Sequence, residues 1–233
     1  MRILAIESAT ASPSVALLDG ERIVAETPAG GTAPGSEALL PAIDALLRQT
    51  VTPLADLDGF ALAIGPGSFT GLRVGLATLK GLAFEDPRPV AAVSTLAALS
   101  RRAGDPRPEP VAALIDARRG ELYAAIWSSG SGSEPVVAEG LYRVDALAAR
   151  LPARCLLVGD AVAPNLPALG ARAGPGARPA PGGAEGPCAA HVGILGARAL
   201  RAGLGRTAAE LVPRYLRRAE AEARRTGQAS EPR

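Results

Sequence analysis

The chain has 233 residues, with 25 Lys or Arg against 23 Asp or Glu and a formal net charge of +2. Its hydrophobic fraction of 48% excludes a wholly disordered chain, and its balanced charge argues against a nucleic-acid-binding surface spread over the whole chain. The single histidine, His191, excludes a multi-histidine metal site within one chain.

The first hundred residues alternate short apolar runs with amphipathic stretches. Asp19-Gly20 separates two apolar runs and predicts a hairpin, because both turn positions tolerate positive φ. Ser36 is predicted to cap a helix in which leucine and isoleucine recur at helical spacing as far as Thr52-Pro53. The predicted strands are Ile3–Ile6, Ser14–Leu18, Arg22–Ala25, Ala61–Ile64 and Pro89–Val93, with further helices from Leu72 to Leu82 and from Ser94 to about Arg102.

The second half begins after a proline-rich linker at 104–110. It contains predicted strands at Val111–Ile115, Glu121–Trp127 and Leu156–Val158, a glycine- and proline-rich loop at 170–187, a helix at Ala189–Ala202 and a polar helical extension at 217–225.

This order of elements predicts an α/β fold with mixed sheets in two lobes. We assign 1–105 to an N-terminal lobe, which a C-terminal helix at about 207–225 would join. Residues 106–206 then form a second, smaller lobe, and 226–233 a frayed tail. No internal repeat is visible in the sequence.

The glycine-rich segment after the strand Ala61–Ile64 is the most informative part of the chain. Gly65, Gly67 and Gly71 lie between that strand and a helix, where backbone N–H groups can face an anion. The segment matches neither a Walker A loop nor GxGxxG. On these general grounds a tight turn with close helix packing is the better interpretation.

Several motifs in the same order resemble the TsaB family, also called YeaZ-like, of the glycoprotease-like superfamily. They are ILAIESAT at 3–10, SEALLPAIDALL at 36–47, GPGSFTGLRVGLATLKGLA at 65–83, VSTLAAL at 93–99, IDARRGELYAA at 115–125 and VPRYLR at 212–217. The match over 128–205 is loose. The resemblance implies a two-lobed actin-like ATPase fold, which is ribonuclease H-like, with mixed sheets.

The resemblance also implies a function. Members of the family are non-catalytic subunits that bind and support a TsaD-like catalytic subunit, which forms N6-threonylcarbamoyladenosine next to the anticodon of tRNA. A TsaE-like ATPase would complete the complex, and a homodimer is a further expectation. ATP, ADP and metal are expected on those partner subunits, with no cofactor on this chain. Contact with tRNA would be indirect.

The residues that the resemblance assigns to partner binding lie on the two helices of the N-terminal lobe. From periodicity alone they are ordinary core positions, but each helix has more apolar positions than one narrow stripe needs. The resemblance implies that these helices pair with the same helices of the TsaD-like subunit, through Leu40, Ile43, Leu47, Phe69, Leu72, Arg73, Leu76 and Lys80.

Catalysis by this chain itself is the alternative. A Mg-nucleotide hydrolase or kinase would use residues bordering the cleft of the actin-like fold, namely Glu7, Gly65, Gly67, Ser68, Gly71, Asp116 and Arg118. Most TsaB-like sequences have Asp where this chain has Glu7, which weakens a nucleotide site, and many have His where it has Gly35. Thr95 and Leu99 stand at the positions of the catalytic subunit's metal-binding histidines, so no metal site and no metallopeptidase activity are expected.

The remaining expectations concern the cellular location of the protein and its charged C-terminal segment. The N-terminus lacks the pattern of a signal peptide, and no apolar run is long enough to span a membrane, so we expect a cytoplasmic protein. In that compartment the thiols of Cys155 and Cys188 are expected to be reduced. Their spacing alone leaves a disulfide open. The net positive charge lies between Arg206 and Arg233. A solvated helix explains it better than tRNA contact, because Tyr215 is the one aromatic there.

Overall fold

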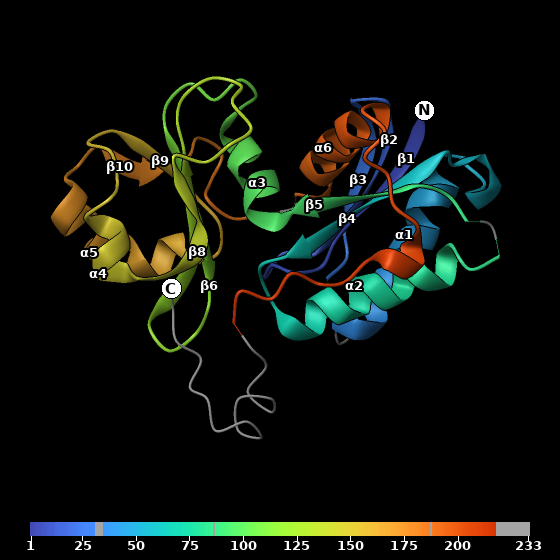
Figure 1. Ribbon diagram of the computed structural model, residues 1–233, viewed down its shortest axis with the longest axis horizontal. Coiled ribbons are helices and arrows are strands. Elements are labelled where there is room, and N and C mark those ends of the chain that lie inside the picture. Colours follow the sequence, from blue (N-terminus) through green and yellow to red (C-terminus); the bar gives the residue numbers. More distant parts are fainter. Residues whose placement is uncertain (31–34, 86, 187, 218–233) are drawn as a thin grey trace. The chain divides into compact units, whose positions relative to one another are not determined.

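A computed structural model describes residues 1–30, 35–85, 87–186 and 188–217. The chain divides into two compact units. Unit 1 comprises Met1–Ala98 together with Pro187–Arg214, and unit 2 comprises Leu99–Gly186 together with the segment that begins at Tyr215. Each unit is built around its own mixed sheet (Figure 1).

The sheet of unit 1 has the strand order β3-β2-β1-β4-β5 among the described residues. Its first three strands form an antiparallel meander, while β4 pairs parallel with β1 and β5 parallel with β4. All five strands predicted for this part of the chain are confirmed. Their bounds are β1 Arg2–Glu7, β2 Ser14–Asp19, β3 Arg22–Pro28, β4 Gly59–Gly65 and β5 Val90–Ser94.

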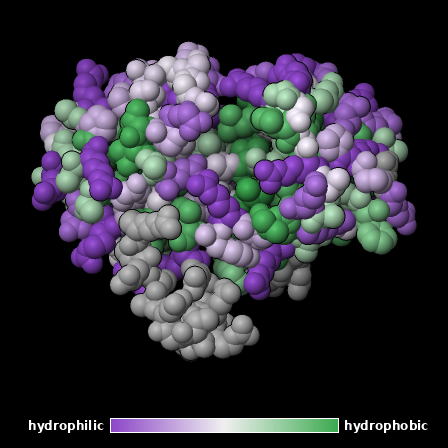
Figure 2. Space-filling view, in the orientation of Figure 1, coloured by the Kyte–Doolittle hydropathy of each residue, from purple (hydrophilic) through white to green (hydrophobic). Residues whose placement is uncertain are grey.

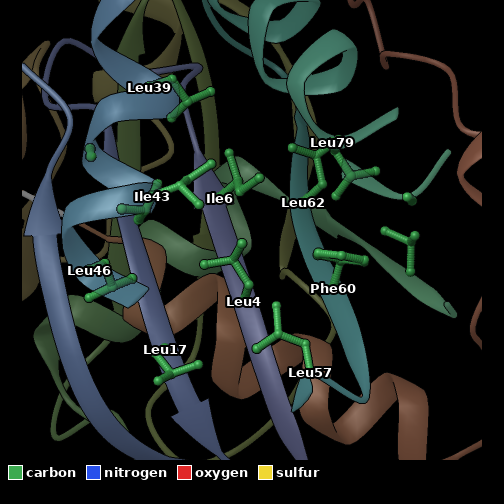
Figure 3. Close-up of a cluster of buried hydrophobic side chains, with 14 of the residues drawn as sticks. Leu4, Ile6, Leu17, Leu39, Ile43, Leu46, Leu57, Phe60, Leu62 and Leu79 are labelled. Atoms are coloured by element: carbon green, nitrogen blue, oxygen red, sulfur yellow. The ribbon is translucent and has the colours of Figure 1, made fainter. Parts of the chain in front are cut away.

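Helices cover both faces of this sheet (Figure 1). Alternate residues of β1 point to opposite faces, so Leu4 and Ile6 enter one core and Ile3 and Ala5 the other. Figure 3 shows Leu39, Ile43 and Leu46 of α1 pointing toward the Leu4 and Ile6 side. On that face lie α1 Gly35–Gln49 and α2 Phe69–Leu82; α6 Ala189–Arg201 lies on the other, and α3 Thr95–Ser100 follows β5.

The position of α6 corrects the predicted domain ranges, in which 106–206 form the second lobe. The helix is confirmed at Ala189–Arg201, but it packs on the sheet of unit 1. The Ser14 Oγ accepts hydrogen bonds from the N–H groups of Cys188 at 3.2 Å and Ala189 at 3.0 Å, which satisfies two of the open donors at the helix N-terminus. Gly196 lets the helix approach the alanine-lined sheet closely, because a Cβ there would collide with Ala61.

Unit 2 repeats the topology of unit 1. Its strand order is β8-β7-β6-β9-β10 among the described residues, and its first three strands are again antiparallel and its last two parallel. Numbered within each unit, both sheets therefore read 3-2-1-4-5, a duplication that the sequence does not reveal. The strands are β6 Val111–Asp116, β7 Glu121–Trp127, β8 Val137–Arg143, β9 Cys155–Val158 and β10 Ala177–Pro179.

Two helices of unit 2 were not predicted from sequence. They are α4 Val144–Ala148 and α5 Val162–Ala173, which pack against each other. Pro167 and Gly170 lie inside α5 and make its sequence resemble a loop. The predicted loop at 170–187 is correct only in part, because its first residues end α5 and β10 lies within it.

The predicted C-terminal helix at about 207–225 is wrong in its described part. Residues 207–217 hold only the 3-10 helix η3 Ala208–Glu210, after which the chain is extended. Leu211 enters the core of unit 1, and the Arg214 N–H donates to the Ile64 carbonyl at 2.7 Å. These contacts hold the extended segment against unit 1. Residues 218–233, including the predicted frayed tail 226–233, lie outside the described residues.

The structure shows the state of the two cysteines and whether any described helix could span a membrane. Cys155 and Cys188 are buried and form no disulfide, and burial raises the pKa of the Cys155 thiol to about 12. Among the described residues, no helix is both long enough and apolar enough to cross a membrane.

The end of α1 generates a stability prediction. Val51 has φ 50° and is 86% exposed, at the position after the helix where glycine is usual. The Thr52 N–H donates to the Leu47 carbonyl at 2.9 Å, as this type of helix end requires. A β-branched residue is strained there, so Val51→Gly should raise the free energy of unfolding by about 0.5–1 kcal/mol in urea denaturation.

Val136→Gly is the matched control, since Val136 is 64% exposed and is not among the residues with positive φ. It should lose about 0.5 kcal/mol through the greater freedom of the unfolded chain. Equal losses for both variants would contradict the assignment of strain to Val51.

Candidate functional site

The first loop of unit 1 is organised around a buried carboxylate. Glu7 ends β1 and is fully buried. Its Oε1 accepts hydrogen bonds from the N–H groups of Ala9 at 2.5 Å and Thr10 at 2.9 Å, and its Oε2 accepts one from the Thr10 hydroxyl at 2.7 Å. Both oxygens therefore accept hydrogen bonds from the loop that follows. In this arrangement Glu7 is a structural acceptor for its own loop.

The glycine-rich segment packs directly on that first loop. The Ser68 N–H donates to the Ala9 carbonyl at 2.7 Å, and the Ser8 hydroxyl donates to the Gly71 carbonyl at 2.8 Å. A Cβ at Gly67 would collide with Ala9, and one at Gly71 would collide with the Ser8 carbonyl. The two glycines are thus needed for the close approach of two backbones.

The start of the same segment is covered by the C-terminal part of unit 1. A Cβ at Gly65, where φ is +117°, would lie 2.6 Å from the Arg214 carbonyl oxygen. At the other end of the segment, the Ser68 Oγ caps α2 by accepting from the Gly71 N–H at 3.2 Å. The N–H groups of Ser68 and Gly71, which a phosphate cradle would use, donate within the chain. The arrangement favours the packing interpretation of the glycines over an anion site.

Asp116 and Arg118 belong to unit 2, whereas Glu7 and the glycine-rich segment belong to unit 1. The two residues form the turn between β6 and β7, where Arg118 adopts φ 65°. One Asp116 carboxylate oxygen accepts from the Arg118 N–H at 2.8 Å, and the other lies 3.3 Å from the Arg118 Nη1. Arg217 donates to the Ala117 carbonyl and pairs with Glu121. These contacts are those of a turn stabilised within unit 2.

The outward side of α1 and α2 carries apolar side chains at the surface of unit 1. Leu40 is 56% exposed and Phe69 is partly exposed, and Leu47 and Leu76 are partly exposed while also packing against the core of unit 1. The Arg73 guanidinium lies 3.8 Å from the centroid of the Phe69 ring, within the range of a cation–π interaction. In Figure 2, hydrophobic side chains lie among hydrophilic ones over the face of unit 1 that carries α2.

Three of the residues that the sequence assigns to this surface need comment. Ile43 and Leu72 are 2% and 3% exposed and belong to the core, so their assignment to a partner surface is corrected. Ile43 points toward the sheet together with Leu46 (Figure 3), and Leu72 is buried on α2 together with Leu79. Lys80 lies at the rim, where its Nζ donates to the Ala209 carbonyl at 3.4 Å.

Three residues bear on whether this chain could bind a metal ion. Thr95 and Leu99 are both buried, and His191 is partly exposed on α6. The residues that the structure describes include no group of three or more His, Cys, Asp or Glu side chains placed to hold a metal ion.

Comparison with known proteins finds similarity to a TsaD family model and to TsaB proteins. Residues 26–158 match the family model described as TsaD, tRNA N6-adenosine threonylcarbamoyltransferase. A relative from Escherichia coli K12, the tRNA threonylcarbamoyladenosine biosynthesis protein TsaB, is 39% identical over 132 residues, or 54% of each chain. The TsaB protein of Bacillus subtilis 168 is 33% identical over 57% of each chain. The matched part therefore spans about half the length of these curated relatives.

Solved structures extend the likeness to nearly the whole chain. YeaZ from Pseudomonas aeruginosa has a TM-score of 0.74 and 30% identity, covering 92% of this chain and 99% of that one. Component A of the (R)-2-hydroxyglutaryl-CoA dehydratase of Acidaminococcus fermentans has a TM-score of 0.53 at 11% identity, covering 85% of this chain and 98% of that one. The second likeness concerns the fold alone. The prediction of an actin-like α/β fold with mixed sheets is confirmed.

Two glycines of α2 test the packing of the glycine-rich segment. Gly71→Ala should lower the free energy of unfolding by at least about 2 kcal/mol, because its methyl group would collide with the Ser8 carbonyl. Gly81→Ala in the same helix has open space around it and should gain about 0.5–1 kcal/mol. Chemical denaturation of both variants measures the difference. Equal effects would show that the two loops do not pack as described.

Proposed function

The chain belongs to the TsaB (YeaZ) family, and on that premise we propose that it is a partner subunit in the formation of N6-threonylcarbamoyladenosine next to the anticodon of tRNA. It would bind and support a TsaD-like catalytic subunit. The observation that carries this proposal is the apolar surface on α1 and α2, made by Leu40, Leu47, Phe69 and Leu76.

The composition of that surface suits a protein partner. Leu40 stands well out from α1, where it would gain from burial in a partner's groove. Arg73 and Lys80 supply a charged rim, and Arg73 already stacks on Phe69, so little side-chain freedom remains to be lost on binding. Aromatic and arginine side chains of this kind are frequent among residues that dominate binding energy.

The role we propose is non-catalytic. The carboxylate of Glu7 and the N–H groups of Ser68 and Gly71, which nucleotide chemistry would recruit, make hydrogen bonds within the chain. Nucleotide and metal would then be held by the partner subunits, a TsaD-like protein and a TsaE-like ATPase, in a cytoplasmic complex. A homodimer through the same α1 and α2 surface would be an isologous contact that competes with the TsaD-like partner.

Association with the TsaD-like protein of the same organism tests the proposal. Leu40→Asp should weaken binding at least about tenfold in calorimetric titration, because it places a charge in the apolar contact. The matched control is Val136→Asp, an exposed apolar position of unit 2, which should bind like the unaltered chain. Both variants should unfold at the same temperature as the unaltered chain. Unchanged affinity for Leu40→Asp would contradict this surface.

Nucleotide titration of the isolated chain tests the alternative of an actin-like hydrolase or kinase. We expect no tight binding of ADP or ATP with Mg²⁺, because the loop donors are already engaged within the chain. Micromolar binding that is lost in Glu7→Ala would instead favour the chain's own nucleotide chemistry.

A further inference from the structure

Residues 208–214, here called the C-terminal segment, pack beside α2 in unit 1 (Figure 1). Toward the end of α2, the Lys80 Nζ donates to the Ala209 carbonyl at 3.4 Å. Before the start of α2, the Ile64 carbonyl accepts from the Arg214 N–H at 2.7 Å. Because these two anchors lie at opposite ends of the helix, the residues between them run along it.

The C-terminal segment continues the layer that α1 and α2 form on one face of the sheet. In the strand order β3-β2-β1-β4-β5, α1 packs on β2 and β3, and α2 packs on β4. Just before the segment, Arg206 exchanges two backbone hydrogen bonds with Val90 of β5, at 2.8 and 2.9 Å. Leu211 is 1% exposed and enters the same core as α1 and α2. The segment therefore lies on the side of α2 that is away from α1.

Val212 is an apolar side chain that the C-terminal segment presents to solvent. It is 68% exposed, whereas Leu211 is buried and Pro213 is partly buried. Successive side chains of an extended chain point to opposite sides, so Val212 points away from the core. The two anchors and the fixed φ of Pro213 already order this backbone, so little freedom remains to be lost on binding.

The size of the proposed partner surface indicates that α1 and α2 need a third element. The two helices contain 15 and 14 residues, of which roughly half turn toward the sheet. A specific and stable interface takes about 20–30 residues from each partner. The C-terminal segment supplies further residues next to α2, in the same layer.

We propose that the C-terminal segment is a third element of the surface that binds the TsaD-like subunit, with Val212 as its apolar contact. This inference rests on the proposed function and extends the surface described for it. It places α2 in the middle, where Phe69 and the stacked Arg73 stand at the centre of the contact. Leu40 of α1 and Val212 then lie on either side of them.

Calorimetric titration with the TsaD-like protein of the same organism tests this inference. Val212→Asp should weaken binding about tenfold, because it places a charge in an apolar contact. The matched control is Leu204→Asp, which should bind like the unaltered chain. Leu204 is 67% exposed and lies just after α6, the helix on the opposite face of the sheet.

The comparison with Leu40→Asp separates this inference from the proposed function. Weaker binding in Leu40→Asp but not in Val212→Asp would overturn the inference and leave the proposed function standing. Unchanged binding in both variants would overturn both. Sedimentation of the chain alone covers a second copy as the occupant. Self-association that Val212→Asp abolishes, with unchanged affinity for the TsaD-like protein, would assign the segment to a homodimer and overturn the inference.

Hydrogen exchange of the unaltered chain covers the case in which Val212→Asp does not fold. Peptides that contain residues 208–214 should exchange at least about twofold more slowly in the complex with the TsaD-like protein than alone. Peptides that contain residues 199–205 should exchange equally in both states. Equal exchange of residues 208–214 in both states would overturn the inference.

Discussion

The direct contact between the first loop and the start of α2 is the constraint on which the rest of unit 1 depends. No side chain separates the backbones at Gly67 and Gly71 from Ala9 and Ser8, so the helix is held at a fixed height above the sheet. That height lets Leu72 reach the core. The height of α2 above the sheet also determines which of its side chains stay at the surface. These include apolar residues of the surface that the proposed function uses.

The same contact is consistent with the supporting role that we propose for this chain. An anion site needs backbone N–H groups that face outward and carboxylates that face a ligand. Here the N–H of Ser68 donates to the first loop, and Glu7 accepts from that loop. The glycines that look like a phosphate-binding signal therefore serve packing. Glu7, Ser68 and Gly71, the candidates for nucleotide chemistry, make hydrogen bonds within these loops.

Local signals in the sequence were sufficient for the elements whose cause is local. The Asp19-Gly20 turn and the apolar runs predicted the meander and the buried strands of both units. Contacts between residues distant in sequence were not predictable. Ser14 accepts hydrogen bonds from the start of α6, and this contact places the helix in unit 1. Periodicity placed Ile43 and Leu40 on one helix without showing that Ile43 faces the sheet. Pro167 concealed α5 because proline normally signals a break.

The central claim is that this chain makes a TsaD-like subunit productive without doing chemistry itself. The most direct measurement is the transfer of the threonylcarbamoyl group from threonylcarbamoyl adenylate to tRNA, with release of AMP, in a reconstituted system of the organism's TsaD-like and TsaE-like proteins, with and without this chain. The account predicts that modified adenosine accumulates only when the chain is present, and that Glu7→Gln, which keeps the side-chain length, supports it as well as the unaltered chain. Full modification without the chain would contradict the account.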